Sequence, residues 1–101
     1  MKTIKKTCDP NCALCNALRI LGDKWAMSIL HHMEKPRRFG VLKREISGIS
    51  EKMLIQTLRN LELHNLVSRK SYHEVPPRVE YSLTKKGLRA LDIMPILRDI
   101  V

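Results

Sequence analysis

Residues 48–61 read GISEKMLIQTLRNL, and their alternation of polar and apolar types predicts a capped amphipathic helix. Ser50 suits the cap because its hydroxyl can accept hydrogen bonds from the free backbone N–H groups of the first turn. Ile49 and Leu54 have the spacing of a hydrophobic staple, which fixes the angle at which the chain enters the helix. Leu54 and Leu58 then start an apolar stripe, so one side of this helix is expected in the core.

The opposite side of this helix carries long side chains that can form hydrogen bonds. Lys52, Gln56 and Arg59 make a face that is cationic and amide-bearing but not acidic, which suits phosphates and base edges. An ordinary solvated helix face is the alternative, and for this helix taken alone it is the better supported one. The rest of the sequence is needed to distinguish a DNA-binding face from a solvated one.

The composition favours one small domain that binds DNA. The chain has 101 residues, which is enough for a single modest core. Its 19 Lys and Arg residues against 10 Asp and Glu residues give a formal net charge of +9, which favours nucleic acid over membrane or acidic protein as the partner. With one Trp, one Phe and two Tyr, the stacking platforms of single-strand binders are scarce, so double-stranded DNA is preferred.

Several functional classes find no support in the sequence. No apolar run approaches the roughly 20 residues of a membrane span, and the basic N-terminus lacks an apolar secretory segment, so we expect a cytoplasmic protein with no membrane partner. No serine, histidine and acid grouping, glycine-rich loop or His-Glu-x-x-His motif is present. We therefore expect neither an enzyme nor a bound cofactor.

The chain divides into a basic arm, residues 1–10, and a folded domain, residues 11–101. The arm shows no periodicity and ends at an Asp-Pro pair. Helical periodicity then predicts two short helices, the first opened by Asn11 and stopped by Gly22, and the second capped by Asp23. These two helices bury little by themselves, so part of the first is a candidate subunit interface.

A third short helix is predicted around Leu42 and Ile46, and Ser47-Gly48 closes it. The turn before it, residues 36–40, carries Arg37 and Arg38 and has room for a short strand. Two short helices joined by a tight glycine-containing turn are typical of a helix-turn-helix. The helix opened by Ser50 would then be the one that enters the major groove.

The segment after this helix predicts a hairpin and a final helix. Residues 66–74 and 79–83 are extended in character, and the prolines in the tip between them stiffen it. A basic hairpin that directly follows a recognition helix is typical of a wing. A last helical segment opens at Thr84, with Pro95 expected to kink or interrupt it. The expected fold is therefore mainly α with a small β-hairpin (α+β).

Four blocks of sequence, which together cover roughly residues 12–97, resemble a known family when taken in order. The blocks are Leu21-Gly22-Asp23-Lys24-Trp25 with Ile29-Leu30, Arg37-Arg38-Phe39-Gly40, Gly48-Ile49-Ser50 with Leu54 and Leu58, and Leu66 to Gly87. Each block is modest alone, but the combination is specific. It resembles the HxlR-type regulators, a MarR-like group of winged helix-turn-helix proteins.

The resemblance implies a sequence-specific transcriptional regulator that binds double-stranded DNA. It implies a homodimer, paired through the first and last helices, on a near-palindromic operator. The DNA-binding residues implied by position are Ser50, Lys52, Met53, Gln56, Arg59, Arg37, Arg38, Lys43 and Arg78. The first five lie on the recognition helix, the next three are expected at phosphates, and Arg78 is expected at the backbone or minor groove. A solvated surface charge is the alternative for each cation, and a protein- or RNA-docking winged helix is the alternative function.

A cysteine at the position of Cys12 also belongs to the resemblance. Many family members hold a cysteine thirteen residues before the tryptophan, where it senses oxidants or electrophiles, and Cys12 stands thirteen before Trp25. A proline usually follows that cysteine, whereas Ala13 follows here. The resemblance therefore implies a redox sensor at Cys12, with Cys8 and Cys15 as possible partners. A nearby helix N-terminus and nearby cations would favour its thiolate.

Two other interpretations of the cysteines stay open. Cys8, Cys12 and Cys15 have the spacing with which radical SAM enzymes hold a [4Fe–4S] cluster, although those enzymes need a much larger barrel. A regulatory metal or cluster would need a fourth ligand, for example His31, His32 or a residue of a second subunit. In the third interpretation, Cys15 is buried packing and Cys8 is incidental.

Overall fold

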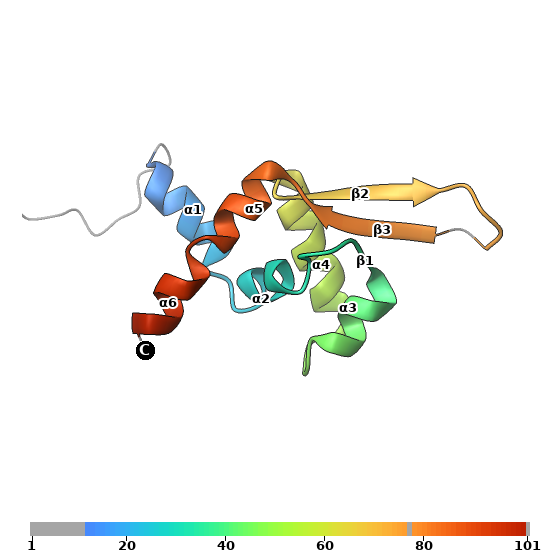
Figure 1. Ribbon diagram of the computed structural model, residues 1–101, viewed down its shortest axis with the longest axis horizontal. Helices are drawn as coiled ribbons and strands as arrows, with labels where there is room; N and C mark the ends of the chain where they lie inside the picture. Colours follow the sequence, from blue (N-terminus) through green and yellow to red (C-terminus); the bar gives the residue numbers. More distant parts are fainter. Residues whose placement is uncertain (1–11, 77, 101) are drawn as a thin grey trace, which may run out of the picture.

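The computed structural model in Figure 1 describes residues 12–76 and 78–100. Its elements are α1 (Ala13–Leu21), α2 (Ala26–His31), β1 (Arg37–Arg38), α3 (Phe39–Glu45), α4 (Glu51–Leu63), β2 (Val67–Tyr72), β3 (Arg78–Leu83), α5 (Lys85–Leu91) and α6 (Met94–Ile100). The three strands form an antiparallel sheet in the order β1-β3-β2. The expected fold, mainly helical with a small hairpin, is confirmed. The predicted basic arm, residues 1–10, lies outside the described residues.

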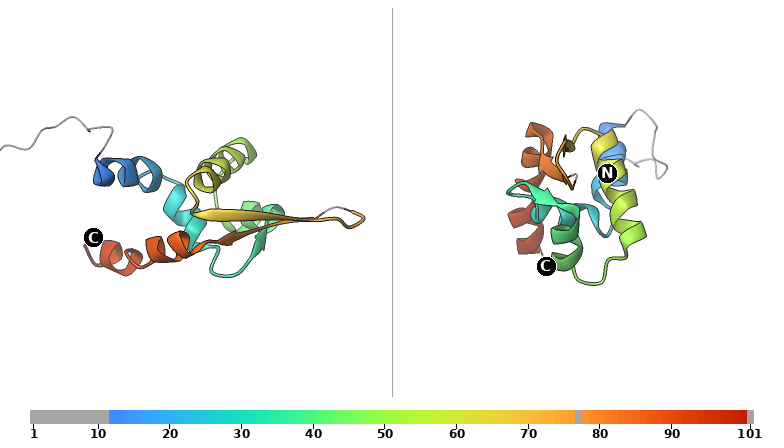
Figure 2. Two further views of the ribbon diagram at one scale, coloured as in Figure 1. Left: turned by 90° about the horizontal axis from the view of Figure 1, so that it is seen from above. Right: turned by 90° about the vertical axis from the view of Figure 1, so that its right-hand side faces the viewer.

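The hydrophobic core lies between the helices and the base of the wing. Its largest fully buried side chains are Ile29, Leu30, Met33, Leu42, Leu54, Leu58, Leu61 and Val67. The hairpin of β2 and β3 projects from this helical body at one end of the molecule, and α1 and α6 lie at the other end (Figure 2). The wing and the terminal helices are therefore well separated, with α4 between them.

The start of α4 is built as its sequence predicts. The Ser50 hydroxyl accepts a hydrogen bond from the Met53 backbone N–H over 3.1 Å, and Ile49 and Leu54 are both buried. At the other end of the helix, Asn65 adopts a φ of 64°, a left-handed conformation that asparagine tolerates. These local features fix the direction in which α4 leaves the core.

Two details at helix starts differ from the sequence predictions. The cap of α1 is Cys12, one residue after the predicted Asn11, which lies outside the described residues. The residue at the start of α2 is Trp25, while the Asp23 carboxylate accepts a hydrogen bond from the Trp25 backbone N–H over 3.3 Å. Asp23 therefore orders the turn before α2 instead of capping the helix itself.

The final helical segment is two helices, and the break lies before Pro95. Helix α5 ends at Leu91 and α6 begins at Met94, so Pro95 stands in the first turn of α6. A proline is tolerated in a first turn because the N–H that it lacks has no partner within the helix there. Within the described residues, no helix has the length and apolar character needed to span a membrane.

Candidate nucleic-acid interface

The outer face of α4 presents four of the predicted site residues to solvent. Lys52, Met53, Gln56 and Arg59 are all exposed, while Leu54 on the opposite side is completely buried. The structure therefore brings these residues together on one helix face. A protruding face with two cations, an amide and a thioether can offer hydrogen bonds and apolar contact to a groove. Ser50 is exposed at the start of α4, but its hydroxyl already accepts the hydrogen bond that caps the helix.

The cations before and within α3 differ in how free they are. Arg38 is exposed at the start of the helix, and Lys43 is half-buried in its last turn. The half-buried Arg37 has intramolecular contacts: its Nε donates to the His32 carbonyl over 3.2 Å, and its Nη1 lies 3.6 Å from a carboxylate oxygen of Glu45. Arg38 is thus better placed than Arg37 to meet an external anion.

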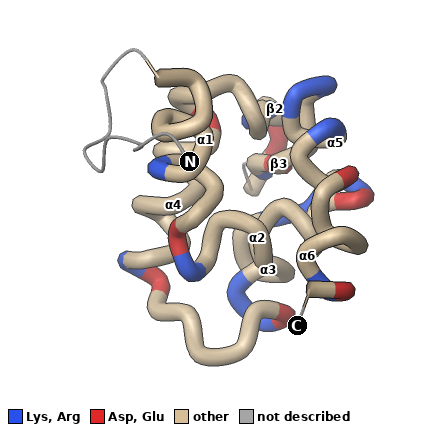
Figure 3. The backbone as a smooth tube through the Cα atoms, turned by 90° about the vertical axis from the view of Figure 1, so that its left-hand side faces the viewer, with Lys and Arg blue, Asp and Glu red and all other residues tan. Residues whose placement is uncertain are grey.

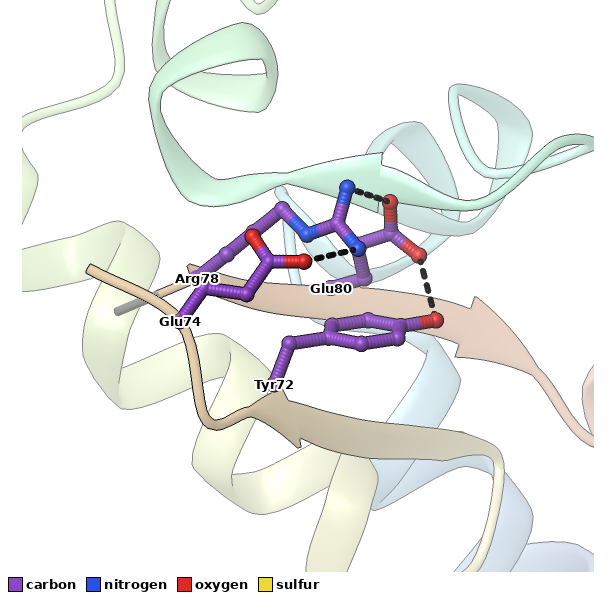
Figure 4. A network of polar contacts seen from close by, with 4 residues as sticks. All are labelled: Tyr72, Glu74, Arg78 and Glu80. Carbon is purple, nitrogen blue, oxygen red and sulfur yellow. Dashed lines mark hydrogen bonds and ion pairs between the residues drawn. The ribbon is translucent and has the colours of Figure 1, made fainter. Parts of the chain in front are cut away.

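Arg78 at the start of β3 is held in a polar network (Figure 4). Its Nη2 lies 3.2 Å from a Glu74 carboxylate oxygen, its Nη1 lies 4.0 Å from one of Glu80, and its guanidinium carbon lies 4.0 Å from the centre of the Tyr72 ring. The Tyr72 hydroxyl also donates to Glu80 over 3.3 Å. Two carboxylates therefore offset the charge of this wing arginine.

A hollow of about 480 Å³ lies between the recognition face of α4 and α1. The sequence does not predict that α1 helps to line it. Arg19 and Asp23 line it on one side, and Gln56, Arg59 and Asn60 line it on the other. Figures 2 and 3 show α1 and α4 on the same side of the molecule. The only sequence signal for Arg19 was its basic character in the last turn of α1, because its proximity to α4 depends on packing between segments far apart in the chain.

Cys12 caps α1, and the hydrogen bonds at this cap lower the pKa of its thiol. Its sulfur accepts a hydrogen bond from the Cys15 backbone N–H over 3.4 Å. This bond is the largest cause that lowers the pKa of the Cys12 thiol, and a hydrogen bond with the Cys15 side chain is the second. Desolvation raises the pKa in opposition, and the Leu14 backbone N–H and the charge of Arg19 lower it by smaller amounts. Hydrogen bonds to a thiolate favour that form, which is the nucleophile in thiol chemistry.

The metal interpretation gains no support from the described part of the chain. Residues 12–76 and 78–100 contain no group of three or more His, Cys, Asp or Glu side chains that could hold a metal ion. Cys8 lies outside the described residues, so the three-cysteine set is not placed. The His32 Nδ1, part of one candidate fourth ligand, lies at hydrogen-bond distance, 2.8 Å, from the Ser28 carbonyl.

Apolar side chains are exposed on the terminal helices. Leu14 and Leu18 of α1 are 67% and 59% exposed, and Ile96 and Ile100 of α6 are 62% and 74% exposed. Much of the backbone at this end, seen in Figure 3, belongs to residues that carry no charge. Exposed apolar patches on a small domain often mark an interface with another protein.

Comparisons with known proteins agree with this geometry. Residues 20–101 match the profile of the HxlR-like helix-turn-helix. The uncharacterised HTH-type transcriptional regulator YkvN of Bacillus subtilis is 49% identical over 82 residues, which are 80% of this chain and 67% of YkvN.

Two solved structures are similar over most of their length. A MarR-family transcriptional regulator from Porphyromonas gingivalis W83 is 42% identical with a TM-score of 0.76, covering 95% of this chain and 92% of that one. The redox regulator HypR in its oxidised form is 37% identical with a TM-score of 0.75, covering 88% of this chain and 90% of that one.

Proposed function

This chain belongs to the HxlR-like helix-turn-helix family and is a transcriptional regulator with a helix-turn-helix DNA-binding domain, and we propose that it recognises a near-palindromic operator in double-stranded DNA as a homodimer. The observation that carries this proposal is the exposed face of α4. Lys52, Gln56 and Arg59 stand on it together, and the leucines behind them are buried in the core. Such a helix can enter a major groove without losing its packing.

Each of the remaining site residues has a proposed place on the duplex. Met53 contacts bases from the same face as Gln56, and Ser50 fixes the first turn of α4 beside them. Arg38 and Lys43 contact phosphates, which positions the protein but reads no sequence. Arg37 supports this contact from its place beside Glu45. Arg78 approaches the backbone from the wing, and the network that holds it shapes that contact.

The homodimer is proposed to pair through α1 and α6. The support is the row of exposed apolar residues on these helices, which lie away from the wing (Figure 1). A two-fold dimer would place its two recognition helices on half-sites about one helical turn apart, roughly 34 Å, or a multiple of this. Pairing at this end leaves both α4 faces free for DNA.

DNA binding measured across a salt series tests the operator proposal. The probes are a duplex selected from a random library with the wild-type protein and a scrambled duplex of equal length. Affinity for both should fall steeply with salt, with a log–log slope near −0.9 per neutralised phosphate, while a preference for the selected duplex persists. Equal affinity for the two duplexes at every salt concentration would contradict the proposal and favour a protein- or RNA-docking module.

Two variants separate base reading from phosphate contact. Gln56→Ala should lower the preference for the selected duplex by roughly 1–3 kcal/mol, because an amide that pairs with a base edge is lost. Arg38→Ala should weaken binding to both duplexes similarly and make the salt slope shallower by about 0.9, because one phosphate contact is lost. If both variants lose equal affinity for both duplexes, the assignment of the recognition face is wrong.

We further propose that Cys12 senses oxidants or electrophiles. The support is its lowered thiol pKa at the start of α1, together with the similarity to HypR, which is named a redox regulator. Oxidation would convert the Cys12 thiol and a second thiol to a disulfide, with the two electrons and two protons passed to the oxidant. Since α1 is a proposed interface helix, a bond there would alter the dimer and thereby the operator affinity.

Cysteine variants treated with diamide test the sensor. Cys12→Ser should bind the selected duplex in the reduced state and show no change after diamide, whereas the wild type should change its affinity. Cys8→Ser and Cys15→Ser are the matched variants, and loss of the response in one of them identifies the second thiol. A Cys12→Ser protein that still responds to diamide would exclude Cys12 as the sensor.

A further inference from the structure

The two carboxylates that hold Arg78 differ in how firmly they are fixed (Figure 4). Glu80 lies within β3, its side chain is 26% exposed, and it accepts a hydrogen bond from the Tyr72 hydroxyl. Glu74 lies outside the strands, beyond the end of β2, and its side chain is 51% exposed. Glu74 is therefore the carboxylate that can leave Arg78 without disturbing the sheet.

The contact between Glu74 and Arg78 uses only part of the guanidinium edge. Nε and Nη2 of an arginine lie on the same edge and can donate two parallel hydrogen bonds to one oxyanion. Here Nη2 is near Glu74, whereas Nε is buried and has no hydrogen-bond partner among the described residues. An anion that accepted from both atoms would satisfy this edge better than Glu74 does.

A hollow at this place connects Arg78 with a second arginine. Its volume is about 490 Å³, and Arg38, Gly40, Glu74, Pro76 and Arg78 are among the residues that line it. Arg38 is exposed, and its strand position is paired with Glu80 across β1 and β3. When Glu74 turns away, two arginines from different elements remain at the wall of one hollow beside the recognition unit.

We propose that Glu74 occupies, in the DNA-free protein, the place that a backbone phosphate of the duplex takes in the complex. The inference rests on the proposed DNA-binding function and extends it to the regulation of the wing contact. The phosphate accepts from Nε and Nη2 of Arg78 and faces Arg38, while Glu80 and Tyr72 keep the guanidinium in position. Glu74 thus lowers the affinity for every duplex, because each binding event has to break its ion pair with Arg78.

A double-mutant cycle with the selected duplex tests this competition. Glu74→Gln should tighten binding about two- to fivefold, because an exposed ion pair contributes a free energy of about that size. It should also make the log–log slope of affinity against salt concentration steeper by up to about 0.9. Arg78→Met, which keeps the apolar stem, should weaken binding. The doubly substituted protein should bind like Arg78→Met alone, because without Arg78 there is nothing for Glu74 to compete for.

A matched variant separates this effect from a general gain in positive charge. Glu34→Gln changes the net charge equally, on an exposed turn that does not line the hollow, and should change affinity much less than Glu74→Gln. An equal gain in Glu34→Gln, or an undiminished gain from Glu74→Gln in the Arg78→Met background, would overturn the inference and leave the proposed function standing. Failure of the wild type to bind any duplex would overturn both.

A direct readout of Arg78 keeps the inference testable even if one variant folds poorly. The Nε–H group of Arg78 can be followed by NMR in the wild-type protein, assigned through its loss in Arg78→Met. On addition of the duplex, its signal should shift and its exchange with water should slow, as expected when a phosphate oxygen accepts from it. An Nε–H signal that is unchanged at saturating duplex would contradict the phosphate contact.

Discussion

The Thr84 hydroxyl donates a hydrogen bond to the Asn65 carbonyl over 2.5 Å, and so joins the chain just after β3 to the turn before β2. The same hydroxyl accepts from the Gly87 backbone N–H over 3.1 Å and thereby caps α5. One oxygen therefore closes the base of the wing and starts the next helix. Thr84→Ala should lower the free energy of unfolding by about 1–2 kcal/mol, because a cap and a cross-chain bond are lost together.

Urea denaturation at a fixed protein concentration measures this loss, since the stability of a dimer depends on concentration. Thr84→Ser is the matched control because serine keeps the hydroxyl and the capping preference. It should lose less than about 0.5 kcal/mol. Equal losses in the two variants would assign the effect to packing of the threonine methyl group instead of to its hydrogen bonds.

Two glycines in helices should respond to alanine in opposite directions. A Cβ at the buried Gly87 would lie 2.2 Å from the Leu66 carbonyl oxygen, a backbone atom that cannot move without shifting the wing. Gly87→Ala should therefore cost several kcal/mol of stability, on the order of other strained core substitutions. A Cβ at Gly40 in α3 would meet nothing within 4 Å, so Gly40→Ala should stabilise the protein by up to about 1 kcal/mol.

Thermal unfolding of the two variants beside the wild type checks this pair. A rise in Tm for Gly40→Ala with a clear fall for Gly87→Ala would confirm that α5 approaches the wing as closely as the structure shows. A Gly87→Ala protein with an unchanged Tm would mean that α5 and Leu66 are further apart. Gly40 also lines the hollow beside Arg78, so this variant is not suited to DNA-binding measurements.

The features that the sequence predicts well are local ones. The Ser50 cap and the staple of Ile49 and Leu54 each depend on residues within a few positions of each other. The residues that form each of these features are therefore close together in the sequence. The exposed face of α4 follows from the helical periodicity of its sequence, so the sequence alone indicates which residues lie on it.

The features that the sequence does not predict depend on register and packing between distant segments. Glu74 and Arg78 are four residues apart, but whether they pair depends on how β2 and β3 align and on Tyr72 lying opposite Arg78. Arg19 lines the hollow beside the recognition face, and this depends on where the fold places α1 relative to α4. Residue types indicate cations at these positions, but not which of them are already paired within the protein.

Charge placed on the terminal helices should separate the proposed dimer. Leu18→Glu or Ile96→Glu would put a carboxylate into the proposed apolar interface. Each should weaken dimerisation about 100-fold or more, because burying an unpaired charge costs several kcal/mol. Sedimentation analysis over a range of protein concentrations measures this, and binding to the selected duplex should fall in parallel.

Val75→Glu is the control for the dimer variants. Val75 is fully exposed at the tip of the wing, so the same charge enters at an apolar residue that the proposed interface does not include. This variant should dimerise like the wild type. Dissociation of all three variants alike, or of none of them, would contradict pairing through α1 and α6.

The reactivity of Cys12 should depend on pH with a midpoint below the ordinary range of a cysteine. Hydrogen bonds from Cys15 lower the pKa of its thiol, so in the folded protein the thiolate forms at lower pH than in the unfolded chain. As pH rises, alkylation by iodoacetamide should therefore accelerate earlier for Cys12 in native protein than for Cys12 in urea, as followed by mass spectrometry of its peptide. Arg19→Met should move the native midpoint upward by a smaller amount than unfolding does, because the arginine charge is a weaker cause than the hydrogen bonds. If native and unfolded midpoints coincide, the cap at α1 does not activate the thiol, and the proposed sensor would lose its chemical basis.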